Sequence, residues 1–235
     1  MADMPESVTA ADGTRLHVIE RGPADGAVVL AVHGFATNAE LNWINTGWER
    51  PLTDAGYRLV AFDLRGHGTS DRPQDATSYR LTTLADDAVT VLDAVGADRA
   101  HWLGYSLGSR IGFEVARQAP DRLRSLSLGG TATADPPVER LLAMIEGLDL
   151  GDGVDGAALR AFATGVSAEA PPMPDAALGI PTLLVAGGDD TLATGGDLLA
   201  ETLGGRYVEL PGRTHANAIT SRAFKDAVLE NLKGI

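Results

Sequence analysis

Short apolar runs alternate along the chain with longer segments of helical spacing. Residues 27–32 and 182–186 are apolar without alternation, which is typical of parallel strands covered on both faces. Residues 15–20 instead alternate between polar and apolar positions and follow closely on 6–11, a pattern that favours an antiparallel hairpin at a sheet edge. Eight strands are predicted, over residues 6–11, 15–20, 27–33, 58–63, 101–105, 124–129, 181–187 and 206–210.

The segments between the later strands predict helices. Within 83–95 the apolar residues fall on one helical stripe, formed by Leu84, Ala88, Val91, Leu92 and Val95. Residues 108–118 and 219–232 are further candidates. Because strands alternate with helices, we expect an α/β fold with an eight-stranded, mostly parallel sheet flanked by helices.

One segment interrupts this alternation. Between the strand that ends near Gly130 and the one that starts at Pro181 lie about 50 residues rich in Gly, Pro and Ala, with helical spacing at 138–148 and 157–163. A stretch of this length without strands is typical of a small inserted subdomain or a lid. The predicted organisation is a core of residues 1–130 and 180–235 with a short lid insertion after the sixth strand, at 131–179.

Composition and charge exclude several classes of function. The net charge is −13 and no basic stripe is present, which argues against a nucleic-acid partner. No apolar run approaches the roughly 20 residues that span a bilayer, so no membrane association is expected. The chain has no cysteine, which excludes disulfides and a cysteine nucleophile. With its acidic, polar start, this composition predicts a cytoplasmic protein.

The stretch Gly104-Tyr105-Ser106-Leu107-Gly108 lies between a predicted strand and a predicted helix. A Gly-x-Ser-x-Gly pattern in this context predicts a sharp, strained turn that lifts the serine above the sheet, with glycines where side chains would crowd the turn. The helix that follows directs free N–H groups and its positive dipole end at the same place. Ser106 is therefore a candidate nucleophile.

A serine nucleophile needs a base, and the base needs an orienting acid. Among the five histidines, His215 lies in a loop after the last strand, at the carboxyl edge of the sheet, where ligands bind in open α/β folds. Asp189 and Asp190 follow the strand at 181–187 and reach the same edge. The alternatives are that His215 starts a helix and that the aspartates cap a helix over 191–203.

These motifs together resemble the α/β-hydrolase superfamily, in its serine esterase, lipase and haloperoxidase-like branch. The resemblance covers nearly the whole chain and rests on "LAVHGFATNAE", "VAFDLRGHGTSDRP", "GYSLGS", "PTLLVAGGDD" and "PGRTHAN". The chain order Ser106, Asp, His215 is that of the superfamily. The insertion is shorter than the four-helix lids of many relatives, which predicts a reduced lid and an open site.

The resemblance implies roles for individual residues. Ser106 would be the nucleophile and His215 the base, with Asp190, the third residue after Gly187, as the orienting acid; Asp189 and, one strand earlier, Asp135 are the alternatives. The backbone N–H groups of Phe35 and Leu107 would form the oxyanion hole. Substrate contacts are expected from His33, Gly34, Tyr105 and Trp43, although Trp43 and Trp48 equally suit loop packing. Asp63, Arg65 and His67 are expected to form a buried loop network.

The function implied is hydrolysis of a carboxylic ester of a small or medium-sized molecule through an acyl-enzyme, without a cofactor or metal. Thioester, lactone, amide or C–C bond hydrolysis and perhydrolysis on the same triad are alternatives. A further alternative is a non-catalytic ligand-binding receptor on the same fold. The serine at 106 argues against dehalogenase and epoxide hydrolase chemistry, which in this superfamily use an aspartate at that place.

Overall fold

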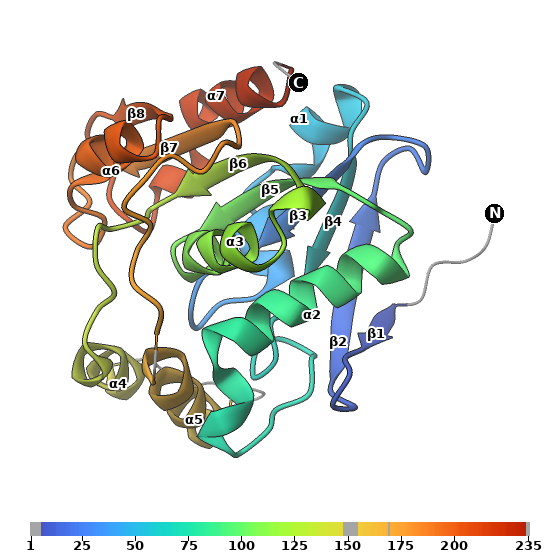
Figure 1. Ribbon diagram of the computed structural model, residues 1–235, viewed down its shortest axis with the longest axis vertical. Helices are drawn as coiled ribbons and strands as arrows, with labels where there is room; N and C mark the ends of the chain where they lie inside the picture. Colours follow the sequence, from blue (N-terminus) through green and yellow to red (C-terminus); the bar gives the residue numbers. More distant parts are fainter. Residues whose placement is uncertain (1–5, 148–154, 169, 234–235) are drawn as a thin grey trace.

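The computed structural model describes residues 6–147, 155–168 and 170–233. These residues form one eight-stranded sheet in the order β1-β2-β4-β3-β5-β6-β7-β8 (Figure 1). The strands are β1 (Ser7–Thr9), β2 (Arg15–Arg21), β3 (Val28–Val32), β4 (Arg58–Phe62), β5 (Ala100–Tyr105), β6 (Leu123–Gly129), β7 (Thr182–Gly187) and β8 (Arg206–Leu210). The predicted eight-stranded α/β architecture is confirmed.

The sheet is parallel from β4 onwards and antiparallel at one edge. β1 pairs antiparallel with β2, as the alternating pattern predicts, and β2 pairs antiparallel with β4. β1 is shorter than the predicted 6–11 because the chain turns at Ala10, whose backbone N–H donates to the carbonyl oxygen of Thr14. All residues of β3 and β4 are buried, as expected of strands covered on both faces.

Two layers of helices cover the sheet. α2 (Leu81–Ala94), α3 (Leu107–Gln118) and α6 (Gly196–Thr202) pack on one face, and α1 (Glu49–Asp54) and α7 (Arg222–Lys233) pack on the other (Figure 1). The predicted stripe of α2 is buried against the sheet: Leu84, Ala88, Val91, Leu92 and Val95. Among the described residues, no helix is both long and apolar enough to cross a bilayer.

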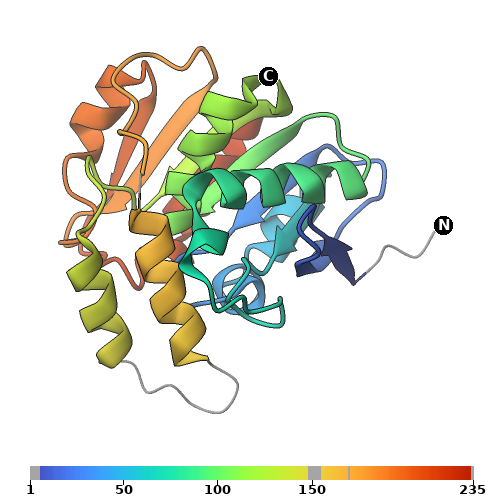
Figure 2. The same ribbon diagram turned by 60° about the horizontal axis from the view of Figure 1, so that its bottom comes forward.

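The helices α4 (Val138–Glu146) and α5 (Gly156–Ser167) form in the segment between β6 and β7. They lie side by side, apart from the layers that flank the sheet (Figures 1 and 2). Asp155 starts α5 by accepting hydrogen bonds from the backbone N–H groups of Ala157 and Ala158. Both helices were predicted from spacing; Leu148, the last apolar residue of the first pattern, lies outside the described residues. We call α4 and α5 the lid helices.

Two helices begin later than the sequence predicts. α7 starts at Arg222 rather than 219 because Ala218–Thr220 forms a separate 3-10 turn. α6 starts at Gly196 rather than 191 because Gly195 adopts a left-handed conformation, with φ of 74°, just before it. In both places the later start leaves a longer loop at the carboxyl edge of the sheet.

Candidate active site

Ser106 lies in a strained turn between β5 and α3. Its φ of 53° and ψ of −114° are uncommon for a residue with a side chain. A Cβ at Gly108 would come within 1.9 Å of the Val32 carbonyl oxygen, and a Cβ at Gly104 within 2.5 Å of the Gly108 carbonyl oxygen. The two glycines are therefore required by close backbone packing, and the turn exposes Ser106 at the end of the strand.

The two residues whose backbone N–H groups are predicted to form an oxyanion hole line the same pocket as Ser106. Leu107 begins α3, and Phe35 follows Gly34 in the loop after β3; both residues line the pocket described below. In the part of the chain that the structure describes, neither N–H group donates to a protein acceptor. They are therefore available to an oxygen bound above Ser106, with the positive end of the α3 dipole behind them.

The loop that carries Phe35 is fixed by hydrogen bonds from both sides. The Gly34 N–H donates to Oδ1 of Asn42 at 3.3 Å, and the Ala36 N–H donates to Nε2 of His67 at 3.1 Å. A Cβ built on Gly34 would lie 3.4 Å from Cβ of Ser106, so the loop passes directly beside the serine. The position of the Phe35 N–H relative to Ser106 is set by this framework.

His215 is held by Asp190. The ring Nδ1 lies 2.8 Å from Oδ2 of Asp190, whose side chain is fully buried. Oδ1 of the same carboxylate accepts the N–H groups of Leu192 and Ala193. Burial raises the pKa of Asp190, but the hydrogen bond and charge of His215 and the two N–H donors outweigh it and bring this pKa below its usual value.

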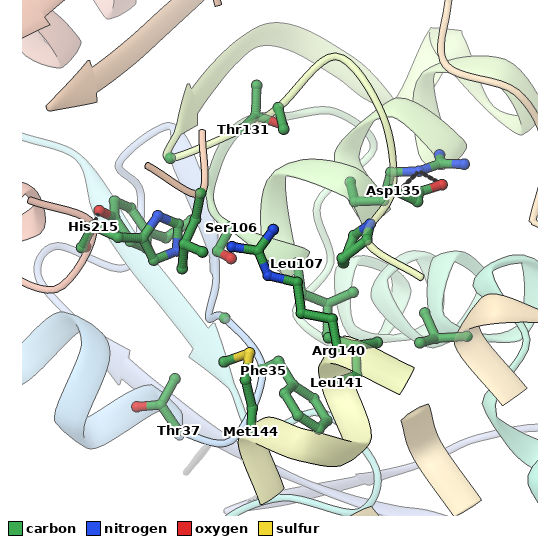
Figure 3. Close-up of a pocket in the computed structure, with 18 of the residues that line it drawn as sticks. Phe35, Thr37, Ser106, Leu107, Thr131, Asp135, Arg140, Leu141, Met144 and His215 are labelled. Atoms are coloured by element: carbon green, nitrogen blue, oxygen red, sulfur yellow. Dashed lines mark hydrogen bonds and ion pairs between the residues drawn. The ribbon is translucent and has the colours of Figure 1, made fainter. Parts of the chain in front are cut away.

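The ionised Asp190 fixes the tautomer of His215. A carboxylate only accepts hydrogen bonds, so Nδ1 of His215 donates and Nε2 is left with its lone pair. His215 and Ser106 line the same end of the pocket (Figure 3), and their side chains are not hydrogen-bonded to each other in this structure. Such contacts often tighten only when substrate binds.

Tyr105 and Gly130 support the His215 loop. The Tyr105 hydroxyl donates to the His215 carbonyl oxygen at 2.5 Å, and the two rings lie 5.4 Å apart between centroids. Burial raises the pKa of Tyr105, so its hydroxyl stays a donor. Gly130, with φ of 60°, leaves room for the imidazole, because a Cβ there would come within 2.9 Å of Cε1 of His215.

The other two candidate acids do not contact His215. Asp189 is exposed next to Asp190. Asp135 lies beyond the end of β6, where its carboxylate pairs with the guanidinium of Arg110 at 2.8 Å. Of the three aspartates that the sequence nominates, Asp190 is the one whose carboxylate meets the imidazole.

A pocket of about 630 Å³ connects these groups with the lid helices. Gly34 and Tyr105, two of the predicted substrate contacts, line it together with Ser106, His215, Phe35 and Leu107, whereas Asp190, which binds His215, is outside the lining. Sequence reasoning missed its other walls, which come from the loops after β3 and β6 and from α4. Those additional lining residues include Asn42, Gly130, Thr131, Arg140, Leu141 and Met144.

The prediction that Trp43 contacts substrate is wrong. Trp43 is fully buried and packs edge-on against Trp48 at 5.7 Å between ring centroids, and Trp48 packs in the same way against Phe224 of α7. The sequence allowed either substrate contact or loop packing for these tryptophans, and the structure shows loop packing. The rings lie beneath the pocket wall rather than in it.

His33 is also corrected: it is fully buried, outside the pocket lining, and supports the loop. Its Nε2 accepts the Leu64 N–H at 3.0 Å and its Nδ1 donates to the Gly34 carbonyl oxygen at 2.7 Å. The expected network of Asp63, Arg65 and His67 is buried next to it. Asp63 accepts the N–H groups of two loops, and Arg65 pairs with the buried Asp87 at 2.7 Å.

Lowering the pH from 7 to 5 should reduce the free energy of unfolding. Burial lowers the pKa of His33 to about 4, of His67 to about 3 and of His101 to about 4, whereas an unfolded histidine titrates near 6.5. Below that value the unfolded chain binds more protons than the folded one, so each histidine removes up to about 1.4 kcal/mol per pH unit. Urea unfolding across this range measures the slope.

The matched variants for this slope are His67→Gln and His17→Gln. His17, which is partly exposed in β2, is the reference for replacing a histidine outside the buried group. His67→Gln should reduce the slope by the contribution of one histidine, up to about 1.4 kcal/mol per pH unit, whatever the substitution does to stability at pH 7. A free energy of unfolding that is flat or rises towards pH 5 in the unsubstituted protein would contradict the prediction.

Comparison with known proteins shows the family and the fold. Residues 27–167, more than half of the chain, match a family model described as the alpha/beta hydrolase fold. Over 122 residues (52% of this chain and 37% of the other) the sequence is 35% identical to epoxide hydrolase A of Mycobacterium tuberculosis (strain ATCC 25618 / H37Rv). The match spans about two fifths of the length of the first curated relatives.

Solved structures match the entire fold. The crystal structure of a hydrolase from Pseudomonas aeruginosa PA01 superposes with a TM-score of 0.82 and 25% identity, over 100% of both chains. An esterase from Exiguobacterium antarcticum superposes with a TM-score of 0.80 and 22% identity, over 98% of this chain and 100% of the other. These superpositions show that the chain shares its overall fold with both structures.

Proposed function

Because the chain belongs to the family of proteins with the α/β-hydrolase fold, we propose that it is a serine hydrolase that cleaves a carboxylic ester of a small or medium-sized molecule. The observation that carries this proposal is His215, held by the buried Asp190 and lining the same pocket as the strained Ser106. A base with a fixed tautomer, a serine lifted out of its strand and two free N–H donors are the parts that acyl transfer needs.

In the proposed mechanism each of these groups takes part in a defined step. His215 accepts the Ser106 proton at Nε2 while Oγ attacks the ester carbonyl, and Asp190 stabilises the imidazolium that forms. The oxyanion is held by the N–H groups of Phe35 and Leu107. The imidazolium then gives its proton to the leaving alcohol, which leaves an acyl group on Ser106. Water, deprotonated by His215, attacks this acyl-enzyme, and the acid and the free serine are released.

The identity of the nucleophile decides between ester and epoxide chemistry. Attack of a serine hydroxyl on an epoxide forms an ether, which water does not hydrolyse near neutral pH. The enzyme would therefore stop after one reaction with substrate. Attack on an ester forms an acyl-enzyme that the same base can hydrolyse. Ser106 therefore favours acyl transfer, although epoxide hydrolases are among the sequence relatives.

Reaction with a fluorophosphonate tests the proposal directly. We expect one covalent label per chain, on the peptide that contains Ser106, because the probe reacts with a serine activated by a base next to an oxyanion hole. A panel of 4-nitrophenyl esters, thioesters and lactones then ranks the substrate classes. Absence of labelling together with absence of turnover on the whole panel would favour a ligand-binding receptor and refute the proposed hydrolase.

A further inference from the structure

Arg140 is a charged residue of the pocket for which the proposed reaction has no use. It lies in the first turns of the lid helix α4, and its side chain extends from that helix into the pocket, towards Ser106 (Figure 3). The neighbouring residues of the helix on that wall, Leu141 and Met144, are apolar. Arg140 is an exposed residue, and its guanidinium is thus a cation at the pocket that holds the proposed nucleophile, next to an apolar wall.

Within the described residues, the guanidinium of Arg140 has no anionic partner. Three and four residues after Arg140 the helix carries Ala143 and Met144, and three and four residues before it the chain carries Pro137 and Pro136. No acid at i±3 or i±4 therefore neutralises the guanidinium. The other arginine of the pocket, Arg110, already has partners: its guanidinium donates to the carboxylate of Asp135 and to the carbonyl oxygen of Pro171. The two arginines therefore have different roles.

The surroundings of Arg140 favour an anion brought by the ligand. The chain as a whole carries a net charge of −13, and a field of this sign repels anions. A guanidinium without a partner in the pocket opposes that repulsion locally. Its planar set of N–H donors matches a carboxylate in bidentate geometry, while Phe35, Leu107 and Leu141 offer apolar surface to the rest of a ligand.

We propose that Arg140 binds a carboxylate of the substrate, so that the ester cleaved at Ser106 carries a second, anionic carboxylate group. The assignment of that molecule as an ester rests on the proposed function; the binding of a carboxylate compound at Arg140 does not. An apolar spacer between the scissile ester and the carboxylate would contact the apolar residues Phe35, Leu107 and Leu141.

Matched pairs of substrates test the proposal. One pair carries the charge on the acyl side: the mono-4-nitrophenyl ester of adipic acid and its neutral methyl ester. The other carries it on the alcohol side: 4-carboxyphenyl acetate and its methyl ester. For each pair we measure kcat/KM for the charged substrate divided by that for the neutral one. Comparing this quotient between variants cancels the intrinsic reactivity of each ester.

Arg140→Gln should lower the quotient by about 10- to 100-fold for at least one pair, the range expected for losing a hydrogen-bonded charge pair. Arg140→Lys should give an intermediate value because it keeps the charge but not the planar fork. The control is Arg160→Gln on the lid helix α5, which removes the same charge from an exposed position outside the pocket lining. Raising the salt concentration should narrow the difference in this quotient between the unsubstituted protein and Arg140→Gln.

A quotient that Arg140→Gln changes no more than Arg160→Gln, for both pairs, would overturn the proposal even if every ester is cleaved. A direct binding measurement separates this failure from failure of the hydrolase assignment. By calorimetry with adipate and 4-hydroxybenzoate, the unsubstituted protein should bind at least one of the two about tenfold or more tightly than Arg140→Gln. Equal affinity in both proteins, or no binding to either, would refute the carboxylate site whether or not the chain turns over esters.

Discussion

Replacing Ser106 with alanine should lower kcat/KM for 4-nitrophenyl esters by at least about 10⁴-fold and abolish fluorophosphonate labelling. The loss is large because the acyl-enzyme route disappears, leaving the acceleration that the oxyanion donors and binding provide. The fold should persist, since the positive φ at 106 is imposed by Gly104 and Gly108 rather than by the hydroxyl. Steady-state kinetics with circular dichroism of both proteins measures the two effects.

The same experiment with His215→Ala tests whether the two residues act as one unit. The single variant should lose about as much activity as Ser106→Ala, and the double variant should lose little more than either, because the base has no function without the nucleophile. Additive losses in the double variant would contradict the shared mechanism. Activity on short esters that survives Ser106→Ala would reject the assignment of the nucleophile.

The fold could be predicted because its signals are local in the sequence. Runs such as 27–32 are apolar throughout, since a parallel strand is covered on both faces, and the glycines at 104 and 108 mark a turn that excludes side chains. The helix starts were predicted less well. Gly195 and the 3-10 turn Ala218–Thr220 shift α6 and α7 by a few residues, because the capping preferences of single residues are weak beside tertiary contacts.

Residues of the candidate site could be predicted from the sequence only where the end of a strand requires a particular residue type. Ser106, Asp190 and His215 follow β5, β7 and β8, and the carboxyl edge brings them together. The prediction that Trp43 contacts substrate was wrong because the sequence does not show which face of a short helix points inward. Arg140 was missed for a different reason: its place in the pocket depends on how the lid helices pack over the sheet, which no local feature of the sequence shows.

Asp190→Asn should lower kcat/KM by about 10³- to 10⁴-fold, the second largest loss after the nucleophile and base. The asparagine carbonyl can still accept the N–H groups of Leu192 and Ala193, so the local turn is kept. Its amide, however, presents N–H donors to Nδ1 of His215, which forces the proton onto Nε2 and leaves no base for Ser106. Kinetics on the ester that gives the highest rate measures the loss.

The matched variants are Asp189→Asn and Asp135→Asn. Asp189 is exposed beside Asp190 but makes no hydrogen bond to the imidazole of His215. Its replacement should therefore change kcat/KM less than about threefold. Asp135→Asn removes the partner of Arg110 at the pocket wall and should act mainly through KM. If Asp135→Asn instead lowers kcat by 10³-fold while Asp190→Asn leaves it intact, the orienting acid lies after β6 and the assignment of Asp190 is wrong. The buried Asp190 carboxylate, bonded at 2.8 Å to the imidazole, is the reason to expect the opposite.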